Sequence, residues 1–352
     1  MQARWRVRAC SVGLCIGVQV FLVGAGAATP LCLNAAWIAG LCALPASALS
    51  VLCCRRILAR RAARRAEESR LMRAASVLLA AAFMVDAVFA AASLISLAEQ
   101  SLLPQTKMLH SMLMTLAAAI ACALSGQGIW NLSFALRFAL PACVAGLCAL
   151  SLPRGQLSGL FPLLGPGAGT LLPGCVCMAA AAFPALLLLA PWDEEMDESD
   201  ESMQMYLPEA GFLIRRALAG AAAGEALLVV LALGGTYTAA GSSIWGRRLL
   251  LAGAGRQHAG IAGMALTVLE AAAMLLLCAH MLQGAERMLC GAFKGLNRYK
   301  AGLFCCAAVF LLLLGALLFS GIRLALAAVP LLSIFPLLVI AAGLWPGGKH
   351  GT

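Results

Sequence analysis

Three carboxylic acids and one histidine lie inside long apolar runs of this sequence, where ionisable side chains are rare. Asp86 stands in FMVDAVF and Glu225 in AAAGEALL, each near the middle of its run, and Glu270 and His280 share a third run. A charged carboxylate in hydrocarbon costs at least about 2.5 kcal/mol, so such side chains usually face a protein interior or a wet cavity. Asp86, Glu225 and Glu270 therefore form either a proton-carrying polar network or a set of structural interhelical hydrogen bonds.

Two glycine-rich segments are the second feature that could do chemistry. GAGAATP covers residues 24–30 and GPGAGTLLPG covers residues 165–174, and both interrupt apolar runs. In hydrocarbon, unwound backbone survives only where protein or a wet cavity receives it. The helix end beside such a break directs its N–H groups at anionic ligands. The alternative is that these glycines and prolines simply mark loop ends.

The composition shows which environment holds these residues. Of 352 residues 62% are hydrophobic and only 11% are charged, and the mean hydropathy is +0.94. A soluble domain carries roughly a quarter charged residues, and an apolar helix of about 20 residues crosses a bilayer. We therefore predict an all-α integral membrane protein. Its ten predicted transmembrane helices are 9–28, 31–54, 74–97, 108–125, 130–152, 167–190, 212–235, 259–282, 301–320 and 325–345.

The two glycine-rich segments occupy corresponding places in this series. They belong to the first and sixth predicted helices, so the chain divides into two halves of five. An odd number of helices in a half inverts the second half relative to the first, as in transporters with inverted repeats and discontinuous helices. We predict a single transmembrane domain over 1–345, with repeat one at about 9–152 and repeat two at about 157–345. Helices one and six are broken in this prediction, and 346–352 form a short cytoplasmic tail.

Basic residues set the predicted orientation, because Lys and Arg near the ends of spans are retained in the cytoplasm. Most of the 25 Lys and Arg fall on one side if both termini are cytoplasmic, including the run at 55–73. That run is either a solvated loop or a contact for anionic lipid headgroups. The acidic segment 192–201 is predicted on the same side, as a solvated loop or a partner-docking segment. His280, near the cytoplasmic end of its span, is predicted to lie at the interface.

The remaining residues with chemical potential suggest neither catalysis nor a cofactor. The 15 cysteines fall almost entirely within the predicted spans or at their ends, where they serve as small apolar residues. No pair of them has zinc-like spacing to a second pair, and no nucleophile elbow or phosphate loop accompanies the four histidines. We therefore expect no enzyme, no metal and no cofactor, and the +10 charge reflects topology rather than nucleic-acid binding.

Four segments together resemble a known family. They are LVGAGAATPLCLNAAWIAGL at 22–41, LLPQTKMLHSMLMTL at 102–116, GIWNLSFALRFALP at 128–141 and LSGLFPLLGPGAGTLLPG at 157–174. In this order and spacing they resemble the spore germination permeases, the B subunits of nutrient germinant receptors. The resemblance extends from residue 10 to about 345. It implies the amino acid-polyamine-organocation transporter superfamily and a leucine-transporter-like core.

The resemblance also implies a function and a site. Members are thought to bind a germinant, often an amino acid, and to signal through A-type and C-type partner subunits in the spore inner membrane. The alternatives left open are a proton-coupled amino-acid permease of the same fold in the cell membrane, and a membrane scaffold without a ligand. The ligand-facing positions carried over by motif are Gly24, Gly26, Thr29, Gly165, Gly167, Gly169 and Thr170.

Overall fold

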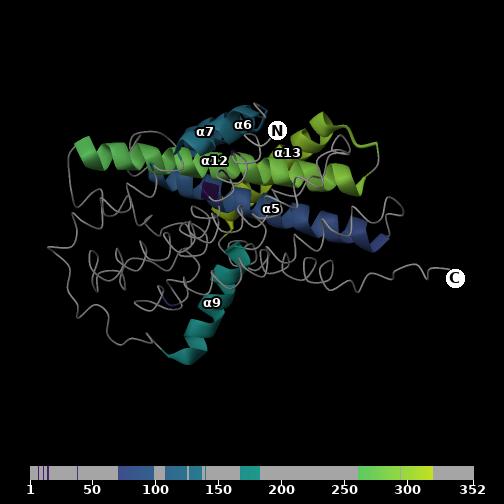
Figure 1. The fold of residues 1–352 in the computed structure, drawn as a ribbon, viewed down its shortest axis with the longest axis horizontal. Helices are drawn as coiled ribbons and strands as arrows, with labels where there is room; N and C mark the ends of the chain where they lie inside the picture. Colours follow the sequence, from purple (N-terminus) through teal and green to yellow (C-terminus); the bar gives the residue numbers. More distant parts are fainter. Residues whose placement is uncertain are drawn as a thin grey trace.

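The structure is a computed structural model of the chain, and it describes six segments. These are residues 70–98, 108–124, 127–136, 167–182, 261–293 and 295–319, together with residues 7, 11, 14, 15, 38 and 139. The segments form helices α5 (Arg70–Leu97), α6 (Met108–Leu124), α7 (Gln127–Leu136), α9 (Ala168–Ala182), α12 (Ile261–Ala292) and α13 (Arg298–Leu318). This part of the chain is all-helical and apolar (Figure 1).

Helices α5 and α12 form the centre of the structure. Leu94 and Leu97, near the end of α5, pack with Met274 in the first half of α12. The two helices therefore run antiparallel, side by side along the long axis of the molecule (Figure 1). Alanine is abundant in α5, and small side chains let helix backbones approach closely. As a result α5 is buried nearly all round, with no exposure at Phe83, Ala87 or Val88.

Helices α6 and α13 flank the central pair. Each of them contacts both α5 and α12, and α7 contacts α6 and α12. The buried face of α13 repeats every three or four residues, as the helical period requires: Ala301, Cys305, Val309, Leu313 and Ala316 are all inaccessible. The opposite face of α13 is apolar but exposed, so it suits a hydrocarbon environment.

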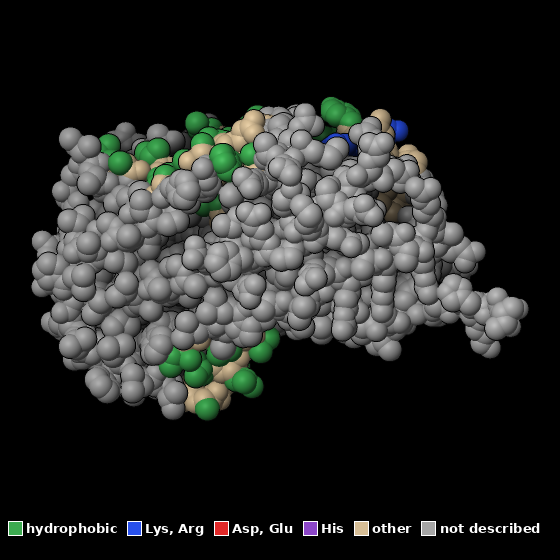
Figure 2. All heavy atoms as spheres, viewed as in Figure 1, with side chains coloured by type: hydrophobic (Ala, Val, Ile, Leu, Met, Phe, Trp, Pro, Cys, Tyr) green, Lys and Arg blue, Asp and Glu red, His purple; other side chains and the backbone are tan. Residues whose placement is uncertain are grey.

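Two of the described helices are long and apolar enough to cross a membrane. They contain the stretches Arg73–Ile95 in α5 and Arg298–Ala316 in α13, of which 78% and 28% respectively is buried. Where the surface of the described part is visible, hydrophobic side chains cover much of α9 and of the bundle (Figure 2). Large apolar residues in exposed positions are expected where lipid is the solvent.

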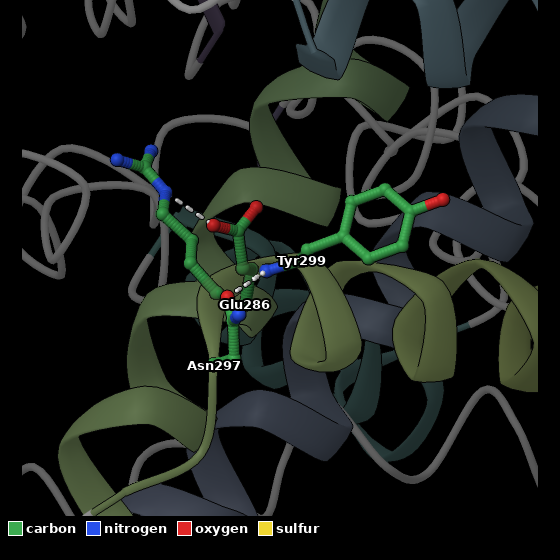
Figure 3. A network of polar contacts seen from close by, with 4 residues as sticks. Glu286, Asn297 and Tyr299 are labelled. Atoms are coloured by element: carbon green, nitrogen blue, oxygen red, sulfur yellow. Dashed lines mark hydrogen bonds and ion pairs between the residues drawn. The ribbon is translucent and has the colours of Figure 1, made fainter.

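A tight turn joins α12 to α13. Gly295 has a φ of +93°, a conformation that L side chains adopt at a cost. Asn297 caps α13, because its side-chain oxygen accepts a hydrogen bond of 3.0 Å from the backbone N–H of Tyr299. Glu286 of α12 forms an ion pair with Arg298 at the start of α13 (Figure 3). These contacts fix the angle at which the chain reverses.

The predicted spans agree with the described helices except at one end. The spans 74–97, 108–125 and 301–320 match α5, α6 and α13 within a few residues, and α7 begins just ahead of the predicted 130. The helix that corresponds to the predicted span 259–282 continues past it, because α12 ends at Ala292. Gln283 and Arg287 in this added part are buried, which is consistent with its helical packing.

The backbone at α9 is more regular than the glycines and prolines predicted. Among the described residues 167–182, only Gly167 departs from the helix, with a φ of +121°. The helix begins at Ala168 and passes through Pro173, so the predicted break does not extend over 168–174. In Figure 1, α9 runs at a steep angle to α5 and α12, on one side of the bundle.

Candidate functional site

One face of α12 carries a buried polar stripe. His280, Gln283 and Arg287 are spaced by three and four residues, which places them on the same side of a helix. Their exposed fractions are 0%, 1% and 9%. An arginine that is buried this deeply needs electrostatic or hydrogen-bonding compensation from its surroundings. The stripe is therefore held against other polar or aromatic groups rather than facing lipid.

Trp130 of α7 provides the aromatic part of that environment. Its ring and the imidazole of His280 are edge-to-face, with centroids 4.4 Å apart and an interplanar angle of 61°. The guanidinium carbon of Arg287 lies 5.9 Å from the centroid of the Trp130 ring. An arginine at that distance is attracted by the negative face of the indole. One indole thus contacts two members of the α12 stripe, two turns apart.

A hydrogen bond joins α7 to α12 beside this indole. The Oγ of Ser133 lies 2.9 Å from the Nε2 of His280, and both side chains are fully buried. Because Ser133 follows Trp130 by three residues, both reach α12 from the same face of α7. The Nδ1 of His280 makes no hydrogen bond within the part of the chain that the structure describes.

The third segment at this junction comes from near the N-terminus. The Oγ of Ser11 lies 2.9 Å from the carbonyl oxygen of Trp130 and 2.7 Å from that of Val7. A hydroxyl has one proton, so Ser11 shares it between these two acceptors. Residues far apart in sequence therefore meet around Trp130, and we call Ser11, Trp130, Ser133, His280 and Arg287 the Trp130 junction.

Asp86 lies level with this junction along the central pair. It is fully buried in α5. Leu94 packs near Met274, and in an antiparallel pair eight residues back along α5 correspond to eight residues forward along α12, about 12 Å in each helix. Asp86 is therefore level with the part of α12 that carries the buried polar stripe.

The start of α9 is a second candidate site. The carbonyl oxygen of Gly167 accepts hydrogen bonds from the N–H groups of Thr170 and Leu171, at 3.2 and 3.1 Å, and from the Thr170 hydroxyl at 2.9 Å. The N–H groups of Ala168 and Gly169, which precede these two bonded ones, have no acceptor within the helix itself. A side chain added at Gly167 or Gly169 would meet nothing within 4 Å, so there is open space beside the first turn of α9.

Pro173 adds an acceptor close to the same terminus. It stands inside α9, and proline has no N–H to donate to the carbonyl four residues earlier. That carbonyl belongs to Gly169, so the hydrogen-bond ladder of α9 leaves its oxygen to another donor. Within the first turns α9 offers both N–H donors and an additional carbonyl acceptor. This combination suits a ligand that carries an anionic group and a cationic group.

The predicted site residues divide into three sets. Gly167, Gly169 and Thr170 come together at the start of α9, and Asp86 lies in the bundle. The backbone of Glu270 is part of α12, but its side chain lies outside the described residues. The predicted residues that the structure does not describe at all are Gly24, Gly26, Thr29, Gly165 and Glu225.

The side chain of His280, which the sequence predicts at the membrane interface, is inaccessible and hydrogen-bonded to Ser133 within the bundle. Sequence reasoning also missed Trp130, Ser133, Gln283 and Arg287. The spacing of His280, Gln283 and Arg287 was the available signal, because it is a helical period that continues beyond residue 282.

The described residues hold no group of three or more His, Cys, Asp or Glu side chains arranged to bind a metal ion. The described cysteines Cys15, Cys175, Cys278, Cys290, Cys305 and Cys306 are all free thiols.

Comparisons with known proteins identify the fold. No protein-family model and no curated protein sequence matches the chain. Solved structures of a manganese transporter from Eremococcus coleocola do match. A histidine-to-alanine mutant of it aligns over 97% of this chain and 82% of its own, at 12% identity and a TM-score of 0.61. A glutamate-to-glutamine mutant aligns over 95% and 78%, at 13% identity and 0.61.

A third structure, the same transporter with an aromatic bis-isothiourea substituted compound, aligns over 95% and 78% at 14% identity and a TM-score of 0.56. At these identities the likeness establishes the fold alone. The chain therefore has a helical membrane fold of the leucine-transporter-like kind.

Proposed function

We propose that this chain uses its transporter fold to bind a small zwitterionic nutrient, an amino acid above all, and acts as the nutrient-sensing membrane subunit of a spore germinant receptor. The start of α9 carries the proposal: N–H donors stand beside the positive-φ Gly167, and Pro173 leaves the Gly169 carbonyl as an acceptor. The carboxylate of an amino acid fits the N–H donors, and its ammonium group fits the carbonyl acceptor. This segment is also part of the resemblance to germination permeases.

The packing of the bundle supports two inverted repeats of five helices. In that arrangement α5 and α6 correspond to α12 and α13. If α5 is exchanged with α12 and α6 with α13, the pattern of contacts stays the same. The reason is that α5 lies antiparallel to α12, while α6 and α13 each contact both α5 and α12. We propose that the full chain has ten transmembrane helices, with helices one and six broken at the ligand and both termini cytoplasmic.

The sensing role requires binding rather than catalysis, so we propose no enzymatic activity. Binding shifts a conformational equilibrium only by its difference in affinity for the two states. In this proposal, A-type and C-type receptor subunits in the spore inner membrane respond to that shift in the conformational equilibrium. The segment 192–201 would be suited to docking one of them, because its acidic residues stand together.

A proton-coupled permease is the second candidate, favoured by Asp86. A buried carboxyl group at the depth of the polar stripe could bind and release a proton in each transport cycle. The solved structures of similar fold are of a manganese transporter, so manganese is a further candidate cargo. Uptake into liposomes separates transport from sensing.

The binding test uses purified full-length protein and measures the shift of its melting temperature with each amino acid and with Mn²⁺. Gly167→Ala and Gly169→Ala form a matched pair, because both sites are open but only Gly167 has a positive φ. We expect Gly167→Ala to lose the shift and Gly169→Ala to keep it. Pro173→Ala should weaken the shift without unfolding the protein, because it returns an N–H to the Gly169 carbonyl.

Each outcome decides between the candidates. An amino acid shift that depends on Gly167 and Pro173, with little pH-driven uptake into liposomes, supports the sensor. Robust uptake that Asp86→Asn abolishes supports the permease instead. A shift with Mn²⁺ alone, or an amino acid shift that neither Gly167→Ala nor Pro173→Ala changes, overturns the site at α9.

A further inference from the structure

The outward face of α13 begins with a basic residue and continues as an apolar stripe. Lys300, Ala307, Leu311 and Leu318 are spaced by seven, four and seven residues, which places them in one line along the helix. All four are exposed, and Leu303 and Phe304 flank the line with exposed fractions of 63% and 59%. We call these six residues the α13 outer face. The inaccessible stripe from Ala301 to Ala316 lies opposite.

The start of this face coincides with the start of an apolar span. The stretch long enough to cross a membrane runs from Arg298 to Ala316, so Lys300 lies at its edge. Tyr299 beside it is 70% exposed, and Phe293 across the turn is 51% exposed. Of these two, the tyrosine is of the amphipathic kind that is enriched at the level of the lipid headgroups. Figure 2 shows basic side chains beside hydrophobic ones near the end where α12 turns into α13.

Among the described residues of this turn, Lys300 carries an exposed charge. Arg298 is paired with Glu286, so its charge is compensated within the protein (Figure 3). The Asn297 cap and the Gly295 turn fix the first turn of α13, and therefore the direction in which Lys300 leaves it. A cation held at headgroup level complements a phosphate diester, which carries one negative charge.

The first part of the stripe, from Lys300 to Leu311, matches the depth of one leaflet. From Lys300 to Leu311 the helix rises about 16 Å, and half of the hydrocarbon core is about 15 Å. Ala307 lies on the line between Leu303, Phe304 and Leu311, where its single methyl group leaves a notch. An acyl chain that starts below Lys300 has a shallow channel along the helix through this notch.

We propose that the α13 outer face binds one anionic phospholipid, with the phosphate at Lys300 and Tyr299 and an acyl chain along Ala307 and Leu311. The occupant is a lipid rather than a protein helix because a cationic headgroup contact stands directly above apolar residues that continue through the depth of the first leaflet. This site is separate from α9 and does not depend on the ligand proposed there.

The test measures lipid retained by the purified full-length protein in native mass spectrometry, with phosphatidylglycerol and phosphatidylcholine as probes. We expect phosphatidylglycerol to be retained about fivefold better, the preference that one basic residue near a membrane surface provides. Lys300→Gln should abolish this preference and Lys300→Arg should retain it. Lys349→Gln, the same change of charge in the C-terminal tail, is the matched control and should leave the preference unchanged.

Two further measurements test the proposed contact with the acyl chain. Ala307→Leu fills the notch and should reduce retention of both lipids while keeping the preference for the anionic one. Glycerol phosphate, which has the headgroup charge but no acyl chain, should not displace the lipid. Displacement by glycerol phosphate, an unchanged preference in Lys300→Gln, or an equal loss in Lys349→Gln would each overturn the proposal.

Discussion

Helices α5 and α13 are both apolar enough to cross a membrane, yet they occupy opposite positions in the fold. The apolar stretch of α5 is 78% buried and that of α13 is 28% buried. Helix α5 is rich in alanine and carries Ser76 and Asp86, both buried, whereas from Leu303 to Leu318 α13 has no ionisable side chain other than its cysteines. Hydropathy therefore selects helices for the membrane, and side-chain size and polarity decide which of them reaches the centre.

The physical reason is that lipid and protein interior are almost equally apolar. A helix gains little hydrophobic free energy by leaving lipid for a bundle, so close packing and polar contacts determine its position. In α5, alanines surround the helix and admit neighbours from several sides. In α13, Leu303, Phe304 and Leu311 are exposed on the outer face, and three of the five inaccessible positions on the inner face are Ala or Cys. The comparison can be tested by pairs of matched substitutions.

The largest difference is expected between Phe83→Ala in α5 and Phe304→Ala in α13. Phe83 is inaccessible and Phe304 is 59% exposed. Removing a buried phenylalanine leaves a cavity that costs about 3–5 kcal/mol, whereas lipid fills the space left at Phe304, so its cost stays within about 0.5 kcal/mol. Unfolding of both variants in detergent, titrated with sodium dodecyl sulfate, measures the two values. Similar losses would show that the two helices are packed alike.

Overpacking should give the next largest difference. Ala87→Leu introduces three carbons where α5 has no accessible surface, which costs about 1–3 kcal/mol. Ala307→Leu makes the same change on an exposed position of α13 and should be neutral in stability. Melting temperatures of the two variants check this pair. A stable Ala87→Leu protein would mean that the centre of the bundle has unfilled space.

A smaller effect is expected where α12 turns into α13. Gly295→Ala forces an alanine into a φ of +93°, which costs about 1–2 kcal/mol. Gly291→Ala is the control, because it also points into open space but lies in the regular helix of α12. There alanine should stabilise by up to about 1 kcal/mol. Opposite signs in the two unfolding measurements confirm that the backbone conformation of the turn, rather than glycine itself, is required.

The smallest effect is expected from the ion pair at the same turn. The Arg298 side chain is 58% exposed, so Arg298→Ala should cost only about 0.2–1 kcal/mol, and less at high salt. A double-mutant cycle with Glu286→Ala, run at low and high ionic strength, isolates the coupling. A coupling that salt leaves unchanged would show that the pair is shielded from water.

The sequence allowed the prediction of the helices of this bundle but not of their contacts. Apolar length alone located α5, α6 and α13, since a membrane span needs a run that few other segments have. The Trp130 junction could not be found this way. It joins Ser11, Trp130 and His280, and nothing local in the sequence states that these three segments meet.

At the α9 site, too, the sequence predicted one part of the structure correctly and another part not. The glycine-rich pattern of the sequence located Gly167, whose positive φ only glycine adopts easily. The prolines of the same segment suggested that the backbone is unwound as far as residue 174, because proline usually interrupts a helix. The structure keeps the helix through Pro173, so the effect of this proline is the loss of one N–H donor rather than a break. Residue preferences are averages, and tertiary context decides the single case.

The length of α12 has a geometric consequence for the whole molecule. Its 32 residues span about 48 Å, and even at a tilt of 40° they cover about 37 Å along the membrane normal, more than the roughly 30 Å of hydrocarbon. This hydrophobic mismatch is relieved if the last turns stand outside the acyl region. Met288, Leu289 and Ala292 in those turns are nonetheless buried, so protein rather than lipid surrounds them. The last turns of α12 therefore continue the helix into the depth of the headgroup layer while protein still surrounds them.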